Sequence, residues 1–115
     1  MLVLNQVIIV GRLTKDPELK TIENGKKVIE AVLAVKRAFK NYEGEYETDF
    51  IKCTLWENLA VYLKTYCKKG DLIAVKGRLQ IRKIENEDKT YSVLELIGEK
   101  ITFLSTAKNN ELDTE

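Results

Sequence analysis

Apolar and polar residues alternate with a period of two along most of this chain, which is the pattern of β-strands. Turn-forming pairs such as Asp16-Pro17 and Asn24-Gly25 separate the alternating segments. The pattern predicts strands at residues 3–13 and 28–39, a third strand that follows the polar segment 41–47 and ends at Trp56, and strands at 72–84 and 91–104.

The period changes between the third and the fourth strand. Four side chains beginning with Leu59 follow i, i+3, i+4, i+7 spacing, which predicts an amphipathic helix over residues 58–68. Asn58 is expected to cap the first turn, and Gly70 to adopt the left-handed conformation that ends the helix. The two tyrosines of this stripe are expected to belong to the core and not to a binding site.

Three strands, a helix and two strands, in this order, predict an all-β domain with one helix: an OB-fold, a five-stranded Greek-key barrel. Gly77, inside the fourth strand, is expected to mark a bulge or bend. Residues 1–104 are expected to form this domain, and residues 105–115 a short, disordered acidic tail.

The third strand carries the clearest candidate chemistry. Residues 50–56 read Phe-Ile-Lys-Cys-Thr-Leu-Trp, so the odd positions form an apolar face. The other face presents Phe50 and Trp56 with a lysine and a threonine between them. Aromatic rings beside positive charge suit the stacking of bases and the neutralisation of phosphates. The alternative is a strand buried on both faces, with both rings in the core.

Positive charge is clustered although the formal net charge is only +1. Two basic clusters contain no acidic residue in the sequence. The first basic cluster is Lys36, Arg37 and Lys40, and the second is Lys76, Arg78, Arg82 and Lys83.

Composition excludes several classes of function. The chain has no histidine, so Ser-His-Asp and Cys-His catalysis and imidazole metal ligands are excluded. It contains no glycine-rich phosphate loop, and we expect neither an enzyme nor a metal or cofactor. The two cysteines form no Cys-x-x-Cys pair, which favours a reduced, cytoplasmic protein without disulfides. No apolar run is long enough for a membrane span.

Several segments closely resemble the bacterial single-stranded DNA-binding protein family, most of all its versions in low-GC Gram-positive bacteria and their phages. The resemblance covers residues 5 to about 104. The matching segments are QVIIVGRLTKDPEL at residues 6–19, AVLAVK at 31–36, DFIKCTLW at 49–56, KGDL at 69–72 and KGRLQIR at 76–82.

The resemblance implies a homotetramer of OB-folds whose outer surface wraps single-stranded DNA without sequence preference in replication, recombination and repair. It would act at the bacterial nucleoid or, if encoded by a phage, in the host cytoplasm. The stacking positions correspond to Phe39, Phe50, Trp56 and Ile84. Ile84 departs from the tryptophan of some members. The segment 85–89 is expected to join the last two strands as a hairpin, and Tyr91, across this hairpin, is expected to substitute in part.

The remaining expected site residues follow from the same resemblance and from the basic clusters. The first strand is where members pair edge to edge into dimers. The expected subunit contacts are Gln6, Ile8 and Ile51. The expected phosphate contacts are Arg12, Lys36, Arg37, Lys40, Lys52, Lys76, Arg78, Arg82 and Lys83.

The end of the chain departs from the family, which usually continues into a flexible linker and an acidic tip ending in Pro-Phe. This sequence ends Asn-Asn-Glu-Leu-Asp-Thr-Glu115. A truncated chain, a short paralogue and a phage version remain open, and partners that read the tip are expected to bind weakly or not at all.

Two other functions of an OB-fold are open alternatives. An RNA or tRNA module would need a 2′-hydroxyl reader or a base-edge pocket, and the sequence shows no such group of residues. A protein-binding adaptor that has lost nucleic-acid binding would not need cations beside exposed aromatics.

Overall fold

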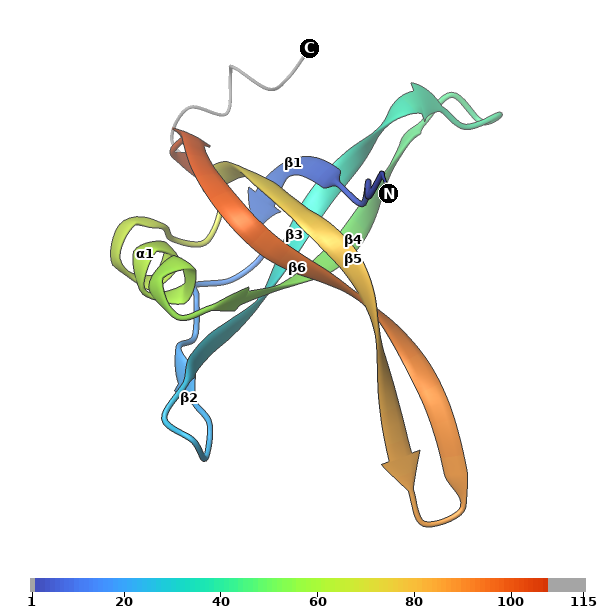
Figure 1. The fold of residues 1–115 in the computed structure, drawn as a ribbon. Helices are drawn as coiled ribbons and strands as arrows, with labels where there is room; N and C mark the ends of the chain where they lie inside the picture. Colours follow the sequence, from blue (N-terminus) through green and yellow to red (C-terminus); the bar gives the residue numbers. More distant parts are fainter. Residues whose placement is uncertain (1, 108–115) are drawn as a thin grey trace.

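The computed structural model describes residues 2–107 and consists of strands with one helix. The two longest strands, β5 and β6, form a hairpin that extends well beyond the rest of the domain (Figure 1). The elements are β1 (Val7–Leu13), β2 (Lys20–Thr21), β3 (Lys27–Lys40), β4 (Tyr46–Trp56), α1 (Asn58–Tyr66), β5 (Leu72–Asn86) and β6 (Lys89–Ser105).

The five long strands close into a barrel. They lie in the order β1-β5-β6-β4-β3, and β1 also pairs with β3, where Arg12 lies opposite Ala34. The pairing of β4 with β6 is parallel, with Cys53 opposite Leu96, and all other pairings are antiparallel. This arrangement confirms the predicted OB-fold, and the two-residue strand β2 is an addition that the sequence pattern did not predict.

The core lies inside the barrel, on the odd-numbered face of β3 and β4. Leu33 and Leu55 are fully buried there, together with Ile73 of β5. Cys53 and Cys67 are buried free thiols. Burial raises the pKa of the Cys53 thiol to about 11, so this group is an apolar core side chain and not a reactive one.

Strand β1 begins at Val7, four residues later than predicted. The apolar side chains of residues 2–4 are exposed. Asn5 imitates a strand pairing with its side chain: Nδ2 donates to the Leu79 carbonyl oxygen (2.7 Å), and Oδ1 accepts from the Leu79 N–H (3.0 Å). Side chains that hydrogen-bond to the backbone in this way compete with regular strand pairing.

The predicted N-cap of the helix is wrong. Glu57 occupies the cap position at a φ of 54°, and no side chain bonds to the first turn. The Glu57 carboxylate instead accepts a hydrogen bond from the N–H of Lys27 at 2.7 Å, which ties the start of α1 to β3. The helix ends at Tyr66, two residues earlier than predicted, and its C-cap Cys67 is extended. Gly70 takes the predicted left-handed conformation at a φ of 89°, but it does not end the helix.

The two tyrosines of the helix do not belong to the core, contrary to prediction. Only Ala60 and Leu63 of α1 are fully buried, because a narrow side of the helix covers the barrel. Tyr66 is 65% exposed and Tyr62 is 36% exposed. Their ring centroids lie 5.0 Å apart, and the two rings line a shallow hollow together with Phe103 of β6.

Gly77 lies at a bulge, as predicted. Lys76 lies opposite Lys100, whereas Gly77 lies opposite Gly98, so Glu99 is the additional residue of β6. A Cβ at Gly77 would overlap the carbonyl oxygen of Ile97. Beyond the bulge the hairpin leaves the barrel, which explains why Leu79 and Ile81 are exposed although they continue the core-facing side of β5.

We expect Gly77→Ala to lower the free energy of unfolding by about 2–3 kcal/mol, because the backbone oxygen of Ile97 cannot give way as a side chain could. Gly25→Ala is the matched control: its Cβ meets nothing within 4 Å, so only its φ of 85° is strained, at about 1–2 kcal/mol. Urea denaturation measures both, and a smaller loss for Gly77→Ala would contradict the close approach of the Ile97 carbonyl oxygen to Gly77.

Candidate nucleic-acid interface

The outer face of β3 and β4 carries the aromatic residues predicted from the alternation. Phe50 lies opposite Ala34, and Trp56 lies opposite Val28. Phe50 is 68% exposed and Trp56 is 37% exposed. These exposures contradict the alternative in which both rings belong to the core, although Thr54 between them is buried.

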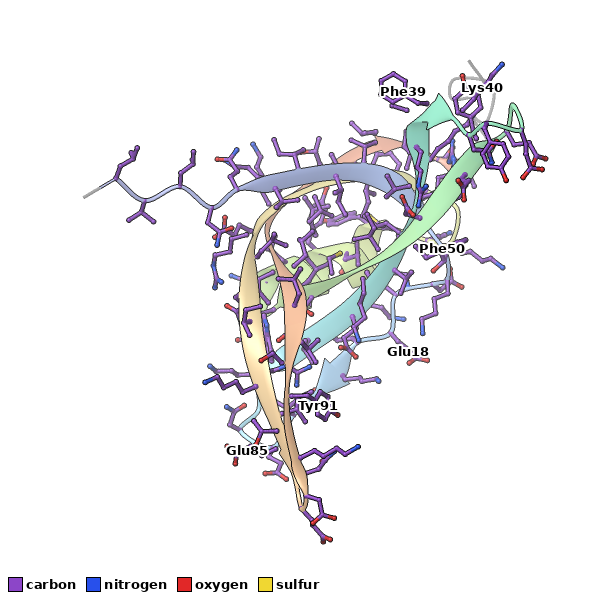
Figure 2. All side chains as sticks on the ribbon, turned by 90° about the vertical axis from the view of Figure 1, so that its right-hand side faces the viewer. Glu18, Phe39, Lys40, Phe50, Glu85 and Tyr91 are labelled. Carbon is purple, nitrogen blue, oxygen red and sulfur yellow. The ribbon has the colours of Figure 1, made fainter. Side chains whose placement is uncertain are left out.

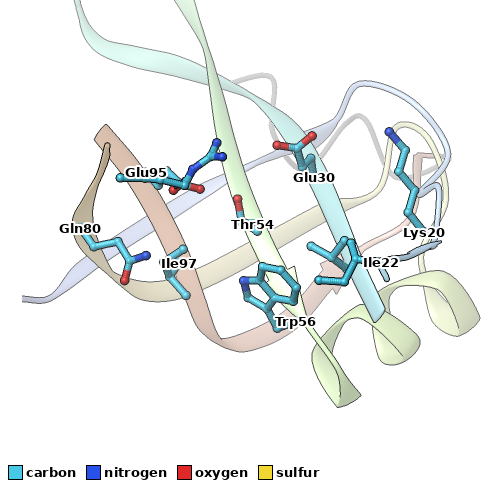
Figure 3. A pocket seen from close by; sticks show the side chains of 10 residues that line it. Lys20, Ile22, Glu30, Thr54, Trp56, Gln80, Glu95 and Ile97 are labelled. Carbon is cyan, nitrogen blue, oxygen red and sulfur yellow. Dashed lines mark hydrogen bonds and ion pairs between the residues drawn. The ribbon is translucent and has the colours of Figure 1, made fainter. Parts of the chain in front are cut away.

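Trp56 lines a pocket of about 400 Å³ on this face (Figure 3). Val28 and Ile97 are its buried apolar side chains, and Thr54 lies next to Ile97 through the parallel pairing of β4 with β6. The hairpin adds polar groups from its outer face. The complete lining is Lys20, Ile22, Val28, Glu30, Thr54, Trp56, Gln80, Arg82, Glu95 and Ile97.

A second aromatic position lies further along the same face and was not singled out from the sequence. Tyr46 begins β4 and is partly exposed. The Nζ atoms of Lys36 and Lys40 lie 4.9 Å and 5.7 Å from the centroid of its ring. The signal was present in the sequence, because Tyr46 and Phe50 are both even-numbered positions of one strand.

In the single chain, Phe39 does not lie beside the rings of Phe50 and Trp56. The register of β3 against β4 shifts between Lys36 and Lys40, so the simple alternation is interrupted there. Phe39 is 85% exposed and lies on the opposite side of the tip of β3 from Lys40 (Figure 2). Its stacking role stays a prediction.

The first basic cluster is not free of acid in the folded chain. Arg37 binds both carboxylate oxygens of Asp49 at 3.0 Å, and it also donates to Glu47 at 3.3 Å. The hydrogen bond from Arg37 lowers the pKa of Asp49 and raises that of Arg37. Both acids come from the neighbouring strand, so a scan along one strand could not detect them.

Three other expected phosphate contacts also have acidic partners. The nitrogen–oxygen distances are 3.2 Å for Lys52 with Glu30, 3.4 Å for Arg78 with Glu99, and 2.6 Å for Arg82 with Glu95. In the part of the chain that the structure describes, Lys36, Lys40, Lys76 and Lys83 form no ion pair. The lysines are therefore the better candidates for direct phosphate contacts.

Arg12 has a structural contact in addition to its expected role. Its guanidinium is partly buried and donates from Nη1 to the carbonyl oxygen of Gly70, which joins β1 to the turn before β5. It also lines a shallow hollow of about 320 Å³ beside Lys36 and Thr48 on the outer face.

The hairpin brings Ile84 and Tyr91 together as directly opposed residues. Tyr91 is partly exposed. Strand alternation places Ile84 on the same face as Gln80 and Arg82, so this pair continues that face toward the tip of the hairpin, beyond the residues that line the pocket.

The expected subunit contacts lie in different environments. Gln6 is exposed just before β1, and Ile8 is exposed on β1. Ile51 is half-buried and packs against the core of its own chain, opposite Leu33.

A barrel whose outer face combines exposed rings with cations is typical of OB-fold domains that bind single-stranded nucleic acid. The sequence profile described as the Single-strand binding protein family matches residues 4–104. The chain belongs to this family.

The chain is similar to several bacterial proteins. It is 46% identical to single-stranded DNA-binding protein B of Bacillus subtilis (strain 168), over 87% of this chain and 89% of the relative. It is 49% identical to the single-stranded DNA-binding protein of Bacillus cereus over 88% of this chain, but it spans only 60% of that relative. Single-stranded DNA-binding protein 3 of Listeria innocua is 43% identical, over 96% of this chain and 76% of the relative.

Among residues 2–107, no helix is long and apolar enough to cross a membrane. Residues 2–107 also contain no group of three or more His, Cys, Asp or Glu side chains that could hold a metal ion. The expected tail residues 108–115 lie outside the described part of the chain.

We expect the lysines and the paired arginine of the first basic cluster to respond differently to mutation. Lys36→Ala with Lys40→Ala should flatten the salt dependence of DNA binding by about 1.4 in log–log slope, or 0.7 per phosphate contact. Arg37→Ala should change the slope less, because two carboxylates already neutralise its charge. Titrations of oligo(dT) at several NaCl concentrations measure the slopes, and an equal or larger effect of Arg37→Ala would contradict the assignment.

Proposed function

We propose that this chain binds single-stranded DNA without sequence preference and protects it during replication, recombination and repair in the bacterial cytoplasm. The outer face of β3 and β4 carries this proposal, because it exposes Phe50 and Trp56 next to lysines. Family membership supports the same function.

Stacking on the exposed rings supplies the affinity for bases. Each of the four bases has a flat π-face, so stacking on Trp56 and Phe50 tolerates any sequence. The pocket beside Trp56 has buried apolar side chains that can contact the part of the base that Trp56 does not cover.

Phosphate neutralisation supplies the second part of the affinity. Lys36 and Lys40 lie beside Tyr46 and have no acidic partner among residues 2–107. Arg78 can contact phosphate by exchanging its carboxylate partner, because its pair with Glu99 is exposed and exposed ion pairs are weak enough for such an exchange.

The chain acts as a homotetramer in this proposal. One edge of β1 pairs with β5, but the other edge pairs with β3 only at Arg12 and Leu13. Residues 7–10 therefore have an open edge, and Ile8 and Val10 expose apolar side chains beside it. An open apolar edge favours pairing with a second copy of the same strand.

Trp56 provides the direct test, because it is the only tryptophan. Oligo(dT) should quench its fluorescence, and Trp56→Ala should weaken binding by about 1–3 kcal/mol for the base lost. Tyr66→Ala is the matched control, since it removes another exposed ring from the helix. A tryptophan that oligo(dT) does not quench and iodide does not reach would contradict the stacking role. Equal binding of oligo(rU) would favour an RNA module instead.

The tetramer is tested by light scattering at micromolar concentration. Ile8→Lys should dissociate the assembly, because it places a charge beside the open edge of β1. Val61→Lys, which changes a partly exposed apolar residue on α1, should leave the assembly intact. A wild-type chain that scatters light as a monomer would contradict edge pairing.

A further inference from the structure

The wall of the Trp56 pocket contains an acidic group that stacking and phosphate neutralisation do not explain. Glu95 of β6 lines this pocket together with Gln80 and Arg82 (Figure 3). Its side chain is only 11% exposed. Carboxylates are seldom buried to this extent unless they are paired.

Arg82 satisfies one oxygen of this carboxylate. Its Nε donates to Oε1 of Glu95 at 2.6 Å. Among the described residues no donor is found for Oε2. An ionised carboxylate only accepts hydrogen bonds, so Glu95 offers the pocket an acceptor that Arg82 holds in place.

We propose that Glu95 accepts a hydrogen bond from an N–H group on the Watson–Crick edge of a base stacked on Trp56. Arg82 is then a positioning residue that fixes the carboxylate. This inference rests on the proposed function, and it adds a polar base contact to a site otherwise explained by stacking.

A base fits this position better than a phosphate does. A phosphate would meet the negative charge of Glu95, whereas a base edge can donate to it. The volume of about 400 Å³ lies within the range of small-molecule pockets, about 300–1,000 Å³. Bases in a single strand have free Watson–Crick edges, which proteins can contact while the ring stacks.

An acceptor at this position is compatible with the absence of sequence preference. Thymine and guanine carry ring N–H groups on this edge, and adenine, cytosine and guanine carry exocyclic amino groups. Every base can therefore donate to Glu95. The pocket distinguishes a base with a free N–H from one whose N–H is blocked, and not one natural base from another.

The test compares an eight-residue oligo(dT) with the same oligonucleotide made from N3-methylthymidine, which stacks but has lost the N–H donor. We expect the wild-type chain to bind the methylated oligonucleotide about tenfold more weakly. Glu95→Gln keeps the side-chain volume but removes the charge, and charge-assisted hydrogen bonds are about twice as strong as neutral ones. The loss of affinity caused by methylation should therefore be only about threefold in Glu95→Gln, and it should be smaller still in Glu95→Ala.

Glu99→Gln is the matched control. Glu99 lies on the same strand and also pairs with an arginine, Arg78, but it does not line the pocket. This variant should keep the full tenfold penalty. Quenching of Trp56 by oligo(dT) should persist in all three variants.

Two results would overturn this inference alone. One is an equal methylation penalty in the wild-type chain and Glu95→Gln, which would indicate steric exclusion. The other is an equal gain in affinity of Glu95→Gln for both oligonucleotides, which would show that the carboxylate only repels DNA. Failure of the wild-type chain to bind oligo(dT) would overturn the proposed function, and this inference with it.

Discussion

The register of β3 against β4 is the constraint on which both the core and the outer face depend. Leu33 lies opposite Ile51, so their side chains share the inner face, while Ala34 lies opposite Phe50 on the outer one. A slip of one residue would exchange the two faces of a strand. The burial of Leu33 and Leu55 therefore also holds Phe50 and Trp56 toward solvent, because the same alternation serves both faces.

Periodicity along the chain was sufficient to predict the five long strands, and their order predicted the barrel. It placed Phe50 and Trp56 on a common face but left open whether that face is exposed. It also identified the bulge at Gly77, because a glycine inside an alternating strand often marks a bulge or a close approach of another backbone. It failed for the tyrosines of α1, since the helical stripe gives the direction of a side chain but not the width of the surface that covers it. Tyr66 lies beyond that surface.

Contacts between strands could not be predicted from a scan along one strand. Arg37 belonged to a cluster without acids in the sequence, yet Asp49 lies across the sheet from it. The pocket is a similar case, because Trp56 and Glu95 are 39 positions apart in the chain and meet only through the pairing of β4 with β6. Such neighbours depend on registers that the sequence alone leaves undetermined.

The acidic partners give the outer face a property that a purely basic surface would lack. Lys52, Arg78 and Arg82 are each paired with a carboxylate, so an approaching phosphate must compete with an existing ion pair. The binding free energy gained from each such contact is smaller than the gain at an unpaired cation. This reduction applies to any polyanion and not only to single-stranded DNA. Stacking has no such competitor within the described chain, so it carries a larger share of the affinity than the number of cations suggests. A surface of this kind favours flexible strands with exposed bases over duplexes, whose bases are already stacked on one another.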